Sequence, residues 1–217
     1  MKRYVIFDLD GTLLNTIEDL GNAVNYALNE MGFPKHPIQA YPAMVGNGVR
    51  KLMERALPAE DRYPQFIDRL LVHFRKYYDV HCCDCTVPYP GIEDLLARLS
   101  AEGIALGVTS NKYQFAVTKI IKHYFPNANW RAILGNEPGI PRKPDPSIVF
   151  EALNWYPMPK RDVLYVGDSG IDMETARRAC IESVGVTWGF RPEQELKDTY
   201  ADHIVSSPDD IYTLVLE

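Results

Sequence analysis

The chain has 217 residues, enough for one well-packed core or for a core with a small inserted domain. Its hydrophobic content of 46% and charged content of 24% are ordinary for a globular protein. The net charge of −6 argues against a nucleic-acid-binding protein and against binding to an anionic membrane surface, because both partners require clustered Lys and Arg.

The N-terminus and the cysteines indicate a cytoplasmic protein. An apolar run follows Lys2 and Arg3, but Asp8 interrupts it too early for a signal peptide. No run approaches the ~18 apolar residues that a membrane-spanning helix needs. Three cysteines crowd into the segment His81–Cys85, which is not a disulfide framework and suits a reducing compartment. That cluster is either structural or a zinc site, although it has no CxxC pair.

The first predicted strand, Tyr4–Phe7, is followed at once by two acids, Asp8 and Asp10. Carboxylates this close repel one another and resist burial unless a cation offsets their charge. We therefore expect a divalent metal beside these acids, and covalent chemistry on a phosphate.

The segment 16–87 carries helical patterns and no convincing strand. Apolar residues recur with helical spacing in three stretches, about 17–31, 49–57 and 66–78. The turn-forming sequence Pro88–Gly91 then leads out of the segment. We expect an all-helical cap domain over 16–87, inserted after the first strand. Ligands of open parallel sheets bind at the carboxyl ends of the strands, so an insert at this point can act as a lid.

The remaining chain alternates between predicted strands and helices. Five more apolar runs are predicted as strands: Ile104–Thr109, Arg131–Leu134, Val163–Val166, Ser183–Val186 and His203–Val205. Their nearly continuous apolar character fits strands covered on both faces. Helices are predicted at 92–99, from an Asp145 N-cap and Pro146 to about Trp155, and at about 171–180. The predicted fold is α/β, with a Rossmann-like three-layer core and a mainly parallel sheet over 1–15 and 88–217.

Further polar residues fall at or beside the ends of the later strands. They are Ser110, Asn111, Lys143, Asp168 and Asp172. Because the carboxyl ends of parallel strands meet at one edge of the sheet, we expect these residues to lie near Asp8 and Asp10.

In order and spacing, these residues resemble the four motifs of the haloacid dehalogenase superfamily of phosphotransferases. The motifs are Asp8-Leu9-Asp10-Gly11-Thr12-Leu13, Ser110-Asn111-Lys112, Lys143-Pro144 and Gly167-Asp168-Ser169-Gly170-Ile171-Asp172. Within the superfamily the chain is most similar to the phosphoglycolate phosphatase branch. The segments that carry this likeness are Val45–Gly48, Ser110–Lys112, Lys143-Pro144 and Gly185–Gly189.

The chemistry assigns a role to each acid. A carboxylate that attacks phosphorus forms an acyl phosphate, and Asp8 at the strand end suits that nucleophile. Asp10, two residues on, suits the general acid and base. Mg²⁺ is the expected metal, with Asp8 and Asp168 as side-chain ligands. The resemblance adds the backbone carbonyl of Asp10. Asp172 is expected to ligate directly, through water, or to hold Lys143.

Three residues are expected to stabilise charge on the phosphoryl group. Lys143 offsets the negative charge of Asp8 and of the phosphoryl group, while Ser110 and the backbone N–H of Asn111 bind phosphoryl oxygens. In the insert, Asn47 and Arg50 belong to a Gly-rich helix start that offers an anion site. Arg50 either holds a carboxylate or second phosphate of the substrate, or is solvated while Asn47 caps the helix.

The sequence therefore predicts a Mg²⁺-dependent phosphomonoester hydrolase with an aspartyl-phosphate intermediate. Its expected partner is a small phosphorylated metabolite, with 2-phosphoglycolate as the first substrate guess. A sugar phosphomutase and an inorganic pyrophosphatase are the nearest alternatives, and a non-catalytic phosphate-binding protein is a third class. A dehalogenase is disfavoured, because Asp10 offers an acid that halide displacement does not need. The oligomeric state, monomer or dimer, stays open.

Overall fold

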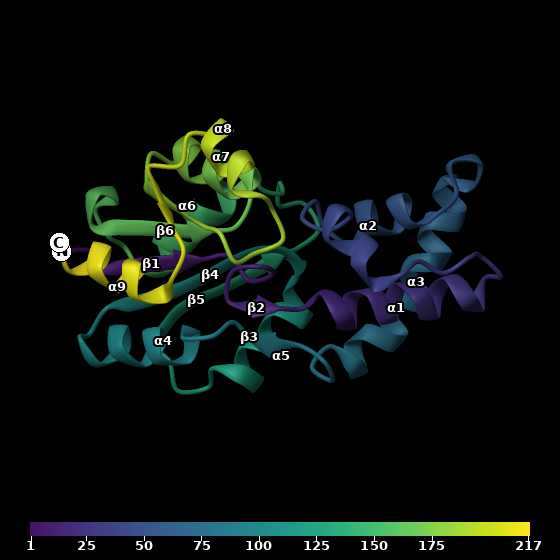
Figure 1. The fold of residues 1–217 in the computed structure, drawn as a ribbon, viewed down its shortest axis with the longest axis horizontal. Helices are drawn as coiled ribbons and strands as arrows, with labels where there is room; N and C mark the ends of the chain where they lie inside the picture. The colour runs from purple at the N-terminus through teal and green to yellow at the C-terminus, as the bar shows by residue number, and fades with distance from the viewer. The chain divides into compact units, whose positions relative to one another are not determined.

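The computed structural model describes residues 1–217, and the chain forms two compact units (Figure 1). One unit comprises Met1–Asn15 together with Pro88–Glu217, and the other comprises Thr16–Val87. A small two-stranded sheet pairs β2 (Leu14–Asn15) with β3 (Val87–Pro88). No helix has the length and apolar character that crossing a lipid bilayer requires.

The first unit is built on a six-stranded sheet of order β5-β4-β1-β6-β7-β8, in which all neighbours run parallel. Its strands are β1 (Tyr4–Phe7), β4 (Ala105–Tyr113), β5 (Trp130–Asn136), β6 (Val163–Gly167), β7 (Glu182–Val186) and β8 (His203–Val205). In the register, Phe7 lies opposite Val108 on one side and Val166 on the other. The chain therefore leaves β1 at the middle of the carboxyl edge, beside the end of β6 and beside β4, which runs on to Tyr113.

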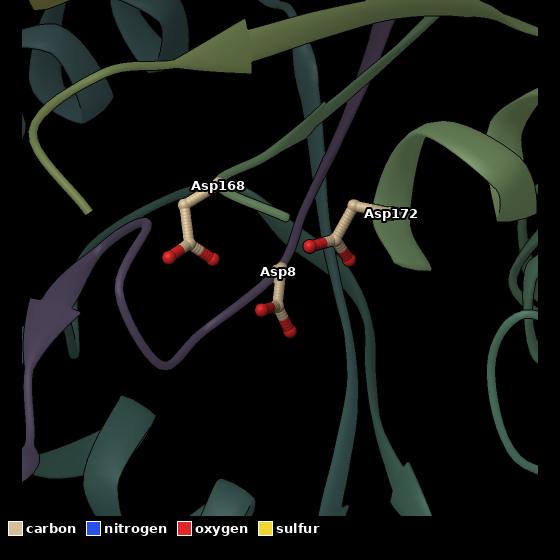
Figure 2. Close-up of side chains that lie close together, drawn as sticks. All are labelled: Asp8, Asp168 and Asp172. Carbon is tan, nitrogen blue, oxygen red and sulfur yellow. The ribbon is translucent and has the colours of Figure 1, made fainter. Parts of the chain in front are cut away.

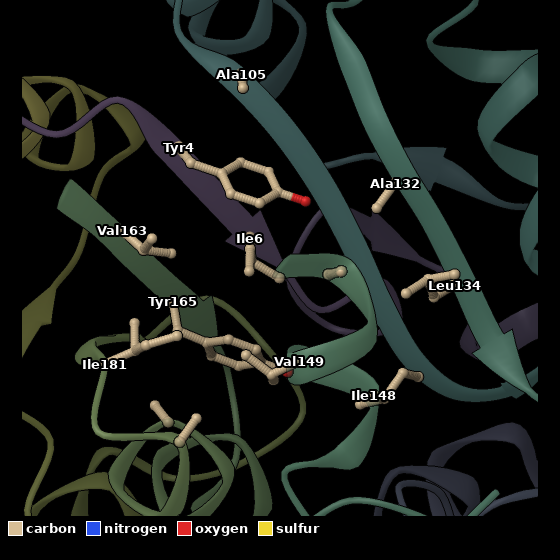
Figure 3. Close-up of a cluster of buried hydrophobic side chains, with 13 residues drawn as sticks. Tyr4, Ile6, Ala105, Ala132, Leu134, Ile148, Val149, Val163, Tyr165 and Ile181 are labelled. Atoms are coloured by element: carbon tan, nitrogen blue, oxygen red, sulfur yellow. The ribbon is translucent and has the colours of Figure 1, made fainter. Parts of the chain in front are cut away.

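Helices cover both faces of this sheet (Figure 1). One face carries α6 (Ser147–Trp155), α7 (Gly170–Ala179) and α8 (Glu193–Asp198), and the other carries α4 (Ile92–Ala101), α5 (Gln114–Tyr124) and α9 (Pro208–Leu216). Figure 3 shows the core on the first face, where Tyr4 and Ile6 of β1 and Tyr165 of β6 meet Val149 of α6. All four side chains are fully buried. The predicted three-layer α/β fold is confirmed.

The strand β4 is longer than the sequence predicts. It continues past Thr109 to Tyr113, so Ser110 and Asn111 lie within the strand and not in the loop after it. The extension arises because the pairing with β5 shifts register after Thr109 and resumes where Tyr113 lies opposite Asn136. The strand therefore continues through an irregular stretch, and Tyr113 at its end again pairs with β5.

The start of α6 also differs from the prediction. Pro146 and not Asp145 is the N-cap residue, and the helix begins at Ser147. The Asp145 carboxylate still accepts hydrogen bonds from the Ser147 backbone N–H at 2.9 Å and from its hydroxyl at 2.5 Å. A short carboxylate thus satisfies the first helical N–H from one position further out than predicted.

The regular structure of the second unit is helical up to its last residue, Val87, which belongs to β3. Its helices are α1 (Ile17–Glu30), α2 (Val49–Ala56) and α3 (Pro64–His81), with short 3₁₀ turns at Ile38–Ala43 and Ala59–Asp61. Each helix buries most of its predicted apolar stripe, including Leu20, Met53 and Phe74. The Asp19 carboxylate accepts hydrogen bonds from the Cys85 N–H at 2.9 Å, and from the Thr86 N–H and hydroxyl at 2.8 and 2.7 Å.

The cluster His81–Cys85 lies at the end of α3. Its members make local contacts, since His81 Nδ1 lies 2.7 Å from Asp84 Oδ2 and the Cys82 side chain is fully buried. Together with the hydrogen bond from Cys85 to Asp19, these contacts fix the chain as it leaves the helix.

Candidate active site

Three buried carboxylates meet at the carboxyl edge of the sheet. Asp8 follows β1, Asp168 follows its neighbour β6, and Asp172 lies in the first turn of α7. Figure 2 shows the three side chains converging, and one oxygen of each lies within 4.8 Å of the others. Parallel strands that end side by side, followed by a helix that starts at once, bring acids distant in the sequence into a single site.

Lys143 joins two of these acids. Its ammonium donates hydrogen bonds to Asp8 Oδ1 at 2.8 Å and to Asp172 Oδ1 at 2.7 Å. It also donates to the carbonyl oxygen of Thr109 at 3.0 Å and lies 3.2 Å from the hydroxyl of Tyr165. The side chain is almost wholly buried, so four oxygens surround a cation that water does not reach.

Negative charge exceeds positive charge in this site, because the Lys143 ammonium and the nearby charge of Arg191 face three buried carboxylates. Burial raises the pKa of Asp8 to about 7; Lys143 lowers it and Asp172 raises it further. Burial, reinforced by Asp172 and Asp8, holds the pKa of Asp168 well above its usual range. Burial lowers the pKa of Lys143, but Asp172 and Asp8 more than offset this and raise it well above the ordinary value. Such a donor set of buried oxygens fits a divalent cation.

The two oxygens of Asp172 are both engaged. Lys143 binds Oδ1, while Oδ2 accepts hydrogen bonds from the Ser169 backbone N–H at 3.2 Å and from its hydroxyl at 2.6 Å. The pair forms a capping box at the start of α7. This arrangement favours the expectation that Asp172 holds Lys143.

Asp10 is paired with Lys112, a residue of the second motif for which the sequence predicted no role. Lys112 Nζ lies 3.1 Å from Asp10 Oδ1, and the Lys112 side chain is only 4% exposed. Only the position of Lys112 in the sequence could have indicated a role in the site, because Lys112 directly follows Ser110 and Asn111 at the same edge of the sheet. A lysine this buried needs a polar partner, and the Asp10 carboxyl oxygen is within reach of its ammonium.

Ser110 and Asn111 also lie at this edge, on β4. The Ser110 hydroxyl oxygen accepts a hydrogen bond from the Lys112 backbone N–H at 3.2 Å. The Asn111 side chain accepts from the Lys143 N–H at 2.9 Å and donates to the Lys143 carbonyl at 3.1 Å. This two-point contact fixes the backbone from which Lys143 reaches the carboxylates, a positioning role that the sequence did not indicate.

Asn47 and Arg50 lie in the helical unit, whereas the carboxylates lie in the sheet unit. Asn47 Oδ1 accepts a hydrogen bond from Arg55 Nη2 at 2.7 Å, and it does not cap α2, whose N-cap is Gly48. Arg50 forms an exposed ion pair with Asp68. Contact of either residue with a substrate therefore stays a prediction.

Comparison with known proteins assigns the family. The model of the haloacid dehalogenase-like hydrolases matches residues 5–186, a span that contains every residue of the site described above. The chain belongs to this family. A phosphoglycolate phosphatase of Pseudomonas putida is 31% identical over 195 residues, covering 88% of this chain and 71% of the relative. One of Aquifex aeolicus is 30% identical over 213 residues, covering 98% and 96%.

Solved structures of similar fold agree with the assignment of this chain to the haloacid dehalogenase-like hydrolases. A Lactobacillus delbrueckii subsp. bulgaricus protein with a provisional phosphoglycolate phosphatase assignment matches with a TM-score of 0.91 and 32% identity, over 99% of both chains. The CbbY protein of Rhodobacter sphaeroides, solved with phosphate, shares the fold at a TM-score of 0.82, with 21% identity over 97% of this chain and 96% of that one. The chain is thus a phosphatase of this family, and its aspartate cluster suits the divalent metal that such enzymes generally use.

Proposed function

We propose that this chain is a Mg²⁺-dependent phosphomonoester hydrolase that acts through an aspartyl-phosphate on Asp8. The observation that carries the proposal is the buried group of three carboxylates with a single lysine between two of them. A small phosphorylated metabolite is the proposed substrate, with 2-phosphoglycolate first, because relatives about 30% identical are named phosphoglycolate phosphatases.

Mg²⁺ is the proposed metal because it is a hard cation that takes oxygen ligands from few carboxylates and keeps several waters. Asp8 and Asp168 would hold it through their side chains, and Asp10 through its backbone carbonyl. When bound, the ion supplies positive charge that neutralises the phosphoryl oxygens.

Asp8 begins the reaction by attacking phosphorus with a carboxylate oxygen. The bond from phosphorus to the leaving oxygen breaks, and Asp10 in its protonated form gives its proton to the leaving alkoxide. In the second step Asp10, now ionised, takes a proton from a water that attacks the phosphorus of the aspartyl-phosphate. This releases inorganic phosphate and restores both acids to their starting forms.

The neighbouring groups keep these two acids in position. Lys143 offsets the charge of Asp8 and of the phosphoryl group, and Asp172 holds Lys143 in place. Ser110 and the backbone N–H of Asn111 are the proposed donors to phosphoryl oxygens. Transfer of this kind depends mainly on positioning and charge stabilisation, which these donors supply.

A panel of phosphate esters tests the proposal. We expect release of inorganic phosphate with Mg²⁺, with the highest kcat/KM on 2-phosphoglycolate among that ester, sugar phosphates and pyrophosphate. EDTA should abolish the release and added Mg²⁺ restore it, because the carboxylates then lose and regain their counter-charge. Conversion of a sugar phosphate to its isomer without phosphate release would instead identify a mutase. No turnover on any ester would indicate a binding protein.

Arg50 is the proposed contact to the acidic end of the substrate. We expect Arg50→Ala to raise KM for 2-phosphoglycolate by about tenfold, the loss of one charge-assisted hydrogen bond, with little change in Tm. Stability should barely change because the pair with Asp68 is exposed, and such pairs contribute little. The control is Lys51→Ala, which removes the adjacent exposed lysine and its pair with Glu54. Unchanged kcat/KM across the whole panel would remove Arg50 from the proposal.

A cytoplasmic location is also proposed. Cys82, Cys83, Cys85 and Cys180 are all free thiols, which suits a reducing compartment.

A further inference from the structure

The 187–191 segment, which joins β7 to α8, reaches back to the first site loop. Trp188 Nε1 donates a hydrogen bond to the Thr12 carbonyl oxygen at 3.0 Å, across 176 positions of sequence. The Phe190 backbone N–H donates to Asp168 Oδ2 at 2.7 Å. This one segment therefore contacts both the loop after β1 and the acid after β6.

Two glycines let these backbones approach the Asp168 carboxylate closely. A Cβ at Gly189 would overlap Asp168 Cβ and Oδ2 and would lie 2.5 Å from the Gly11 carbonyl oxygen. A Cβ at Gly11 would overlap the same carboxylate and would lie 3.0 Å from the Phe190 ring. Real side chains do not tolerate such distances. The Asp168 carboxylate therefore lies in a narrow space between Gly11 and Gly189, and only glycine at both positions leaves room for it.

One carboxylate oxygen of Asp168 is already engaged by these neighbours. Oδ2 lies against Gly11 and Gly189 and accepts the Phe190 N–H, which leaves Oδ1 as the atom to offer to a cation. Asp8 and Asp172 each accept a hydrogen bond from the Lys143 ammonium, whereas Asp168 accepts one from the Phe190 backbone N–H and also feels the charge of Arg191, which lies in the same segment. Its orientation is therefore set by the 187–191 segment.

We propose that Trp188 and Gly189 are positioning residues that fix Asp168 as a metal ligand, by clamping the 187–191 segment to the loop after β1. The Trp188 hydrogen bond sets where the segment lies, and Gly189 lets it approach. Neither residue touches the reacting atoms. Groups that orient a ligating carboxylate typically govern metal affinity by about 10- to 100-fold, because a free carboxylate must be ordered when the ion binds. This inference rests on the proposed metal-dependent function.

Calorimetric titration of Mg²⁺ into the EDTA-stripped, dialysed full chain tests the inference without substrate. We expect Trp188→Phe and Gly189→Ala each to raise the Mg²⁺ dissociation constant by about tenfold or more. At saturating Mg²⁺, Trp188→Phe should regain most of the wild-type kcat. A merely structural role would instead lower the Tm of the metal-free protein and leave the Mg²⁺ affinity unchanged.

Two matched controls separate positioning from general damage. Trp155→Phe makes the same change at a tryptophan that is 60% exposed. Gly185→Ala adds a methyl group to β7, where the three atoms nearest to the new Cβ belong to the Leu196 side chain and not to Asp168. Both controls should bind Mg²⁺ like the wild type.

The outcomes distinguish the inference from the function beneath it. Equal Mg²⁺ affinity in the wild type, Trp188→Phe and Gly189→Ala overturns the positioning role, as does an equal loss in Gly185→Ala. If Gly189→Ala does not fold, the Trp188→Phe result alone decides. A wild type that does not bind Mg²⁺ overturns the proposed metal-dependent function instead.

Discussion

Replacement of Asp8 by asparagine is expected to lower kcat by about 10⁴-fold or more while the protein stays folded. The amide has nearly the same shape but cannot form an acyl phosphate, so the proposed reaction loses its nucleophile. Steady-state phosphate release on 2-phosphoglycolate with Mg²⁺ measures the loss. Turnover that stays within tenfold of the wild type would contradict an aspartyl-phosphate on Asp8.

Asp8→Asn is also expected to keep or raise the thermal stability of the metal-free protein at high pH. The pKa of Asp8 is raised by burial to about 7, so its ionised form is disfavoured in the folded, metal-free protein. A carboxyl whose folded pKa is raised loses stability as the pH climbs from about 4 toward 7. Asparagine does not ionise, so in EDTA at pH 8 the Tm of Asp8→Asn should equal or exceed that of the wild type. The exposed control Asp198→Asn should change neither kcat nor Tm.

The sheet could be predicted because its strands carry a local signal. Runs such as Tyr4–Phe7 and Val163–Val166 are apolar without alternation, and burial on both faces demands that composition. The strand β4 was less predictable beyond Thr109, because its polar continuation is held by pairing to β5 rather than by its own composition. Pairing across the sheet is a tertiary property that a short window of sequence does not contain.

In the site, too, some residues could be predicted from the sequence and others could not. The positions of Asp8 and Asp168 follow from motifs at strand ends, and that of Lys143 from a motif in the loop after β5, since parallel topology brings strand ends and the loops after them to one edge. The partners that orient them do not follow. The contact of Phe190 with Asp168 is made by a backbone N–H, which has no residue-type signature. The pairing of Lys112 with Asp10 depends on side-chain direction, which spacing alone leaves undetermined.

Lys143→Met is the second change with a large expected effect. It keeps the aliphatic stem but removes the only cation that binds Asp8 and Asp172. Breaking a buried ion pair from one side costs about 3–5 kcal/mol, because the partner charge is left uncompensated. For a chain of this size that corresponds to a fall in Tm of about 6–20 °C, measured in EDTA at pH 8. Phosphate release should be lost as well, since Lys143 offsets the charge of both nucleophile and substrate.

The pH dependence identifies the cause of that fall. At pH 5 Asp8, with its raised pKa of about 7, is largely protonated in the folded state, so there is less negative charge to compensate. The Tm deficit of Lys143→Met relative to wild type should therefore grow as the pH rises from 5 to 8. A deficit that is the same at both pH values would indicate lost packing and not lost charge. The exposed control Lys122→Met should show no deficit at either pH.

The double variant Asp8→Asn with Lys143→Met completes the argument. If unpaired charge causes the instability, removing one carboxylate should recover part of the Tm lost in Lys143→Met, even though a second residue has been changed. The two substitutions would then be strongly non-additive in the free energy of unfolding, as groups in direct contact are. Turnover would not return, because the nucleophile is absent. Recovery of stability without recovery of activity thus separates the two tasks of Lys143, balancing the buried acids and serving the phosphoryl group.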